Sequence, residues 1–234
     1  MRAVLKKELS LYYHTTIGFI FVSVFMMFAS YYFLFYNILD NTSDLSMLFQ
    51  TMLITLVFLI PVLTMRLLSE EKKTKSDQIL FTSPVSITAV VLGKYFAALI
   101  VFLISIVCSL VFPIIVFSNG NPEPGVIFSV YFGFVIIGAV FISIGLFISS
   151  LTESQVIAAI FTFGILLFIE LSDSLRGSVG NDKIIEFLKW GSVTERYKNF
   201  CMGVLNFADI VYLVSIIAVF VFLTVRVIEK RRWS

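Results

Sequence analysis

The sequence has little charge for its length. Charged residues make up 14% of its 234 residues, whereas they make up about a quarter of a typical soluble domain. Hydrophobic residues reach 59%, 26 residues are Phe, and the mean hydropathy is +1.01. Because bulky apolar side chains can face lipid tails without a hydration cost, this composition excludes a water-soluble fold and predicts a membrane protein.

Cysteine and histidine are nearly absent. Cys108, inside an apolar run, and Cys201, much later in the chain, give neither a disulfide framework nor a zinc site, and we expect both to be packing residues. The single histidine, His14, has no Cys or carboxylate at ligand spacing, which excludes a metal site built on histidine.

Sequence patterns of catalysis are also missing. There is no Gly-x-x-x-x-Gly-Lys-Ser/Thr phosphate loop and no Gly-x-Ser-x-Gly nucleophile elbow. We therefore expect no enzymatic activity and no bound cofactor in this chain, so that any ATPase would be another subunit. The net charge of +2 comes from Lys and Arg at membrane edges, which excludes a basic nucleic-acid-binding face.

Long apolar runs divide the chain into six candidate transmembrane helices. Each is long enough to cross a hydrocarbon core of about 30 Å. The runs occupy residues 17–36, 48–67, 87–117, 126–150, 155–172 and 207–228. The first is too long for the apolar region of a signal peptide, so we expect it to remain a membrane helix. Gly133, Gly138 and Gly145 permit close helix packing. The prediction is one all-α polytopic membrane domain over residues 1–234.

Positive charge is distributed unevenly along the chain. Twelve of the 17 Lys and Arg residues lie in the N-terminal segment, the second connection and the C-terminal segment, while connections 37–45 and 118–125 contain none. The positive-inside rule therefore predicts both termini in the cytoplasm, and an even number of spans agrees. Connection 173–206, external by parity, carries mixed charge, which predicts a folded element there.

The N-terminal segment is amphipathic. Residues 1–14 place Leu5, Leu9 and Tyr12 at helical spacing among basic residues. This pattern predicts an interfacial helix on the cytoplasmic leaflet. The alternative is a basic flank that only orients the first span, and both interpretations can hold together.

Residues 69–86 form the longest cytoplasmic connection. The segment begins with dense charge and ends at Pro84, which blocks continuation of a helix. Glu70 to Lys73 would expose alternating charge, and the apolar residues 79–81 would pack on the bundle or insert into a partner's cleft. A solvated connector is the alternative, but it would leave residues 79–81 exposed, so we favour a docking helix.

Residues 182–203 have the pattern of two short amphipathic helices, which predicts a helical hairpin at the outer surface. Its apolar face would cover neighbouring spans or the outer mouth of a pathway. Simple interfacial anchoring, with Trp190 and Tyr197 at headgroup level, is the alternative. The residues of this predicted external gate are Ile184, Ile185, Leu188, Tyr197 and Phe200.

Glu170, near the outer end of the fifth span, is the best candidate for a pathway residue, because charges inside spans are costly and mark ion or substrate routes. Asp173 and Arg176 follow one and nearly two turns later and could instead hold it in an interfacial cluster. The spans contain no charge relay, which disfavours ion-coupled transport.

Several stretches, spread in order over nearly the whole chain, resemble ABC-2-type permeases, with the gliding-motility-type branch closest. The stretches are Leu67 to Lys94 with its Glu-Glu-Lys-Lys-Thr and Leu-Phe-Thr-Ser-Pro segments, Ser149 to Ala159, Phe200 to Tyr212, and Arg231-Arg232-Trp233. This resemblance implies a cytoplasmic coupling helix that contacts an ATPase. Its implied contact residues are Glu70, Glu71, Lys72, Lys73, Thr74, Asp77, Gln78, Leu80 and Pro84.

The resemblance also implies partners. Two permease protomers, identical or paralogous, would carry two cytoplasmic ABC ATPase subunits that bind ATP and Mg. The second and fifth spans would line the route between protomers, in what we expect to be a bacterial plasma membrane.

Three hypotheses follow. The first is an exporter permease that moves an amphipathic or hydrophobic substrate, which the family does not identify. The second is a mechanotransmitting or regulatory subunit that passes ATPase motion to an external partner through residues 173–206. The third, an ion-coupled carrier with a functional Glu170, ranks last.

Overall fold

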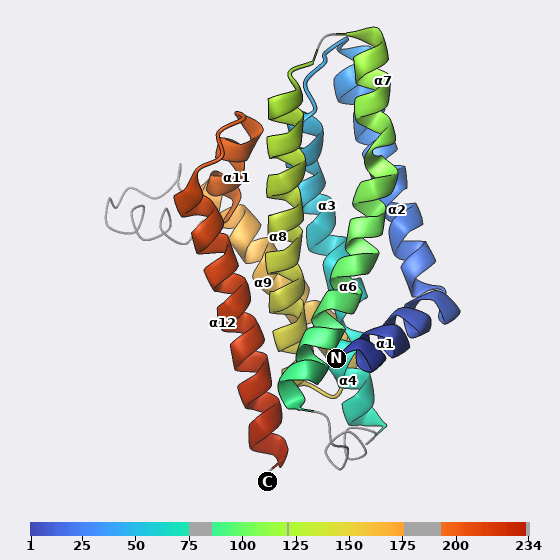
Figure 1. Ribbon diagram of the computed structural model, residues 1–234, viewed down its shortest axis with the longest axis vertical. Helices are drawn as coiled ribbons and strands as arrows, with labels where there is room; N and C mark the ends of the chain where they lie inside the picture. Colours follow the sequence, from blue (N-terminus) through green and yellow to red (C-terminus); the bar gives the residue numbers. More distant parts are fainter. Residues whose placement is uncertain (75–85, 121, 176–192, 233–234) are drawn as a thin grey trace.

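The computed structural model describes residues 1–74, 86–120, 122–175 and 193–232 (Figure 1). All regular secondary structure in these ranges is helical. The elements are α1 (Arg2–His14), α2 (Ile17–Phe33), the π-helix η1 (Leu34–Leu39), α3 (Ser46–Thr64), α4 (Arg66–Lys73), α6 (Ile87–Ser109), α7 (Val111–Asn119), α8 (Pro124–Leu151), α9 (Gln155–Leu175), α11 (Val193–Cys201) and α12 (Phe207–Arg232).

Six helical stretches among the described residues are long and apolar enough to cross a membrane, which confirms the predicted all-α polytopic membrane fold. They are Ile17–Leu39, Ser46–Lys73, Ile87–Ser118, Pro124–Leu151, Gln155–Ser172 and Phe207–Arg231. Each overlaps one predicted span. The second is longer than expected because α4 continues α3 after a one-residue break at Met65.

Helix α8 lies at the centre of the bundle. In its most apolar 18-residue window 83% of residues are buried, against 17% for α12. Three glycines of α8 are sites of close approach, because a β-carbon at any of them would overlap a neighbouring side chain. The pairs are Gly133 with Phe200 of α11, Gly138 with Phe102 of α6, and Gly145 with Thr64 of α3.

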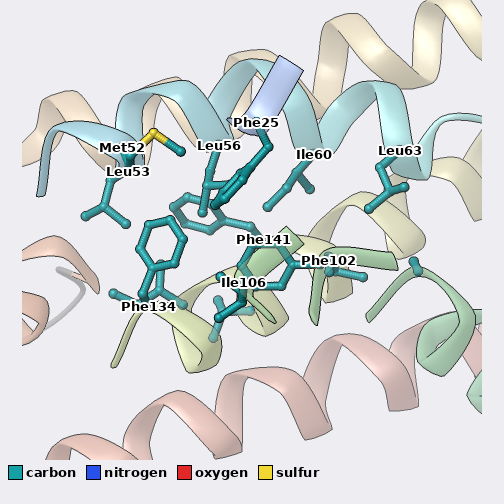
Figure 2. Close-up of a cluster of buried hydrophobic side chains, with 14 of the residues drawn as sticks. Phe25, Met52, Leu53, Leu56, Ile60, Leu63, Phe102, Ile106, Phe134 and Phe141 are labelled. Carbon is teal, nitrogen blue, oxygen red and sulfur yellow. The ribbon is translucent and has the colours of Figure 1, made fainter. Parts of the chain in front are cut away.

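Phenylalanine rings from three helices meet in the core. Phe25 of α2 and Phe102 of α6 lie with ring centroids 6.3 and 6.0 Å from that of Phe134 of α8, and all three are fully buried. Figure 2 shows an aliphatic row of α3, including Leu56 and Ile60, that faces these rings. Because lipid tails are as apolar as these side chains, dispersion between well-packed rings holds the bundle together.

Helices α9 and α12 leave broad apolar faces uncovered. Ile160 and Phe168 of α9 and Phe222 of α12 are each more than half exposed. Cys201 is half-buried but Cys108 is exposed, so the expectation that both are packing residues is wrong for Cys108. A span that is apolar all round does not reveal from its sequence which side faces lipid.

Both termini lie at the same end of the bundle as α4, and α7 and α11 lie toward the other end (Figure 1). Helix α1 turns sharply into α2 at Thr16, whose φ of 60° lies in the left-handed region. Such a conformation is unusual for a β-branched residue. The turn lets α1 lie across the bundle, where it packs on α6.

Candidate functional site

Helix α4 receives its N-terminal cap from another helix. The side chain of its N-cap residue, Met65, accepts no hydrogen bond from the first backbone N–H groups of the helix. Instead, Oγ of Ser149 in α8 accepts hydrogen bonds from the N–H groups of Leu68 (3.1 Å) and Ser69 (3.2 Å). The same hydroxyl donates to the carbonyl of Met65 at 3.1 Å. Ser149 therefore fixes the break between α3 and α4 to the end of α8.

A second contact joins α4 to the same end of α8. The ammonium of Lys72 donates to the carbonyl oxygen of Ser150 in the last turn of α8. Carbonyls there have no partner within the helix and carry partial negative charge, so a lysine is a favourable partner.

Lys94 of α6 lies in a buried ion cluster. Its side chain is 1% exposed, and Nζ lies 2.8 Å from Oε1 of Glu8 in α1 and 3.0 Å from Oε1 of Glu71 in α4. The ammonium also donates to the carbonyl of Leu67 at 2.7 Å. All three ammonium protons thus have an acceptor, as a buried charge requires.

The charges of this cluster balance. Nζ of Lys7 lies 3.7 Å from Oε1 of Glu71, so two lysines face the two carboxylates of Glu8 and Glu71. Lys7 is 61% exposed, so its contribution is screened by water. A cavity of about 160 Å³ opens beside these residues between α1 and α4.

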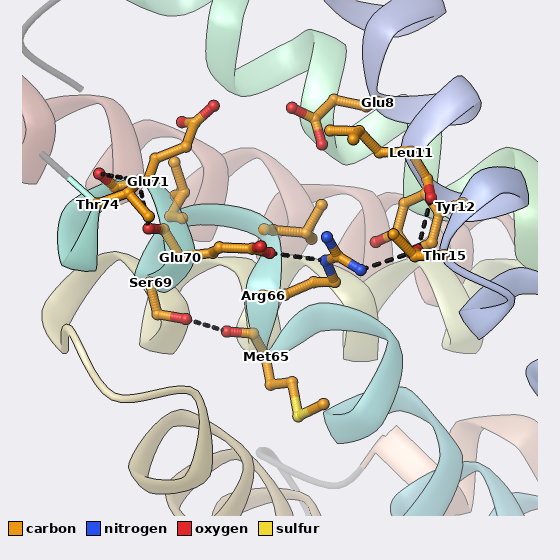
Figure 3. A network of polar contacts seen from close by, with 12 residues as sticks. Glu8, Leu11, Tyr12, Thr15, Met65, Arg66, Ser69, Glu70, Glu71 and Thr74 are labelled. Atoms are coloured by element: carbon orange, nitrogen blue, oxygen red, sulfur yellow. Dashed lines mark hydrogen bonds and ion pairs between the residues drawn. The ribbon is translucent and has the colours of Figure 1, made fainter. Parts of the chain in front are cut away.

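Arg66 makes a further contact between α4 and the end of α1 (Figure 3). Its guanidinium lies 2.9 Å from Oε2 of Glu70 and donates to Oγ1 of Thr15 at 2.9 Å. Nearby, the phenol of Tyr12 donates to the carbonyl of Leu63 at 2.8 Å. Burial raises the pKa of Tyr12 well above its usual range, so it remains a donor.

The structure describes five of the predicted coupling residues, from Glu70 to Thr74, and the other four, Asp77, Gln78, Leu80 and Pro84, lie outside the described residues. The expected row of exposed charges is wrong in part, because Glu71 is 15% exposed and points to Lys94. Lys73 is exposed as expected, and Thr74 after it is exposed too. The 3.6-residue period of a helix turns every third or fourth residue inward, whatever its charge.

Sequence reasoning missed Glu8, Arg66, Lys94 and Ser149 as members of this site. One signal was available: Lys94 is a charged residue inside an apolar span, where an ionised group needs a partner. The partner itself could not be inferred, because Glu8 lies 86 residues away.

The predicted external gate is described only in α11, since Ile184, Ile185 and Leu188 lie outside the described residues. Tyr197 and Phe200 are fully buried. The phenol of Tyr197 donates to the carbonyl of Val130 at 3.4 Å, and Phe200 packs on Gly133. Tyr197 therefore packs on α8 and is not a surface anchor.

Glu170 joins two helices. Its Oε2 accepts a hydrogen bond from Oγ1 of Thr194 in α11 at 2.9 Å. The side chains of Asp173 and Arg176, its expected companions, lie outside the described part. The contact with α11 gives Glu170 a structural role between helices.

A family model described as ABC-2 family transporter protein matches residues 36–172, more than half of the chain. The match begins in η1 and extends into α9, so it includes Glu71, Lys94 and Ser149. Helix α1 with Glu8, and helices α11 and α12, lie outside it. No curated protein matches the chain.

Proposed function

The chain belongs to the ABC-2 transporter family, and we propose that it is an exporter permease driven through α4 by a separate cytoplasmic ATPase. Membership makes the chain a membrane-spanning permease component of an ABC transporter. Coupling through α4, and the direction and substrate of transport, are the proposed part.

The observation that carries this proposal is the position of α4 between three other helices. Arg66 ties it to α1, Glu71 to α6, and Lys72 to α8. A helix is stiff along its axis, so a push on α4 would reach all three neighbours together. Glu70, whose side chain is 41% exposed, and the exposed residues Lys73 and Thr74 form the surface of α4 that an ATPase subunit would contact.

The described spans also support an apolar cargo. The buried charged residues among those described are Glu8, Lys94 and Asp209. Glu8 lies in α1, outside the six spans, and Lys94 and Asp209 lie toward the starts of α6 and α12. No buried charge relay crosses the described part of the bundle, and this favours a hydrophobic or amphipathic substrate over an ion.

The assembly we propose has two permease protomers, identical or paralogous, and two ATPase subunits that hold ATP and Mg. Exposed apolar side chains on α3 and α9, such as Phe58 and Phe168, offer a face for a second protomer. Both termini would lie in the cytoplasm of a bacterial cell, in line with the positive-inside rule, and the gliding-motility-type branch remains our assignment.

The test is co-purification of the tagged chain from native membranes in mild detergent, with identification of bound proteins and an ATPase assay. We expect a P-loop ATPase at equal stoichiometry, and at least threefold less bound ATPase in Glu70→Ala. The matched control is Glu229→Ala, which removes a similarly exposed carboxylate paired with Arg226 at the end of α12.

Recovery of a pure, ATPase-free oligomer would overturn the proposal. A bound ATPase that is active in vesicles but moves no labelled lipid or hydrophobic dye would favour the mechanotransmitting alternative.

A further inference from the structure

Helix α1 carries its acidic and basic groups on different sides. Its one carboxylate, that of Glu8, is buried and lies 2.8 Å from Nζ of Lys94 in α6. The three basic residues of its first two turns, Arg2, Lys6 and Lys7, are exposed. The charge that α1 presents to its surroundings therefore has one sign, because the acidic group is taken up by the face that packs on α6.

Two of the basic residues share one side of α1 with an aromatic ring. Arg2, Lys6 and Tyr13 lie at positions i, i+4 and i+11, a spacing that places them along one side of a helix, and we call them the basic stripe. Lys7 lies about 100° around the helix from Lys6, and its Nζ is 3.7 Å from Oε1 of Glu71. Neither Arg2 nor Lys6 has an ion-pair partner among the described residues.

The aromatic end of the basic stripe lies beside the first span. The ring of Tyr13 contacts that of Phe19 in the first turn of α2, with centroids 5.4 Å apart (Figure 1 shows the turn between the helices). Phe19 and Ile20 are 57% and 55% exposed, and exposed apolar side chains on a membrane span face lipid tails. The Tyr13 end of the stripe therefore adjoins the lipid-facing surface of α2.

Contacts on the opposite face of α1 fix how the basic stripe is presented. The phenol of Tyr12 donates to the carbonyl of Leu63 at the end of α3, and the carboxylate of Glu8 pairs with Lys94. Rotation of α1 about its axis would break both contacts. The stripe is thus held in one orientation, which lowers the entropy cost of binding a partner there.

We propose that the basic stripe binds anionic phospholipid, with Arg2 and Lys6 pairing with lipid phosphates and the ring of Tyr13 lying at headgroup level. Guanidinium and ammonium groups are the usual protein partners of phosphate, and tyrosine is enriched at headgroup level because its ring is apolar and its hydroxyl polar. This surface lies outside residues 36–172, which match the family model, and it does not depend on coupling through α4.

The test is native mass spectrometry of the full chain in non-ionic detergent, titrated with dioleoylphosphatidylglycerol and with dioleoylphosphatidylcholine. The two lipids have the same tails, so a difference in affinity reports on the headgroup. We expect phosphatidylglycerol to bind at least about fivefold more tightly, since each Lys or Arg near an anionic lipid surface strengthens binding about fivefold. Equal affinities for the two lipids would overturn the proposal.

Two adjacent lysines provide a matched pair of variants. Lys6→Gln removes a charge of the basic stripe and should weaken phosphatidylglycerol binding about fivefold, with phosphatidylcholine binding unchanged. Lys7→Gln removes the same charge from another side of the helix, so it should weaken binding less than about twofold. An equal loss in both variants would show that net charge attracts the lipid, and it would refute the stripe.

A further variant separates charge from folding. Arg2→Lys/Lys6→Arg keeps both charges on exposed positions and should retain the preference for phosphatidylglycerol. Loss of the preference in this variant would contradict phosphate pairing.

A soluble competitor separates lipid from free anion. Glycerol phosphate carries the charged part of the headgroup without tails and should not displace phosphatidylglycerol. Displacement at equal concentration would reveal a site for a soluble anion and would contradict docking of a membrane lipid.

Discussion

Nζ of Lys94 lies 3.0 Å from Oε1 of Glu71, and this ion pair connects the two helices on either side of residues 75–85. Glu8 of α1 shares the same ammonium at 2.8 Å. The elements that enter and leave the predicted coupling segment are thus held to each other and to the N-terminal helix by one buried charge. A force on α4 would act on this cluster as well as on the contacts of Arg66 and Lys72.

Lys94→Met should destabilise the protein strongly. The change removes the cation shared by Glu8, which is buried, and Glu71, which is 15% exposed, and breaking a buried ion pair from one side costs about 3–5 kcal/mol. The measurement is the midpoint of thermal unfolding in detergent, with the exposed Lys73→Met as control. Similar midpoints for the two variants would show that the cluster contributes little.

Glu71→Ala and Glu70→Ala should differ in stability although the residues are adjacent. Glu71→Ala leaves Lys94 with one carboxylate fewer and should lower the unfolding midpoint clearly. Glu70 is 41% exposed in its pair with Arg66 one turn away, and Arg66 keeps its hydrogen bond to Thr15, so Glu70→Ala should lower the midpoint much less. The reverse order would contradict the inward orientation of Glu71.

Gly138→Ala should destabilise the bundle by about 1–3 kcal/mol, because the new methyl group would overlap the ring of Phe102. Gly125→Ala in the same helix is the control, since no atom lies within 4 Å of its β-carbon position. The measurement is the free energy of unfolding of the two variants in detergent, which should be lower for Gly138→Ala. Equal stability would contradict the close contact of α6 and α8.

Cys201 should react slowly with maleimide. Burial raises the pKa of the Cys201 thiol to about 12, and the reactive form is the thiolate. At pH 8 we expect labelling at least about a hundredfold slower than at an exposed cysteine, rising about tenfold per pH unit. The measurement is the rate of maleimide labelling of a variant that keeps Cys201 as its only cysteine. The comparison is a variant whose only cysteine is introduced by Asp40→Cys. Equal rates at pH 8 would contradict burial of the thiol.

The orientation can be tested in intact cells. In a cysteine-free background, a membrane-impermeant maleimide should label Asp40→Cys and should reach Lys73→Cys only after permeabilisation, because the positive-inside rule places α4 in the cytoplasm. Both positions are exposed, Asp40 directly after η1 and Lys73 at the end of α4. The opposite pattern would reverse the orientation.

The sequence by itself determined that this is a membrane protein and how many times it can span the bilayer. Runs of apolar residues that are long enough for a bilayer leave few alternatives, because unpaired backbone groups are not tolerated in lipid. The glycines of α8 were also identified as packing sites, since small residues are what close helix contacts need.

Only the tertiary structure decided which helix is central, where Cys108 faces, and which charge of α4 points inward to Lys94. Apolar spans look alike in sequence because lipid and core demand the same side chains. The ion cluster joins Glu8, Glu71 and Lys94, which lie far apart in the chain. An ion pair depends on distances of a few ångströms between side chains, and only the folded arrangement of α1, α4 and α6 sets those distances.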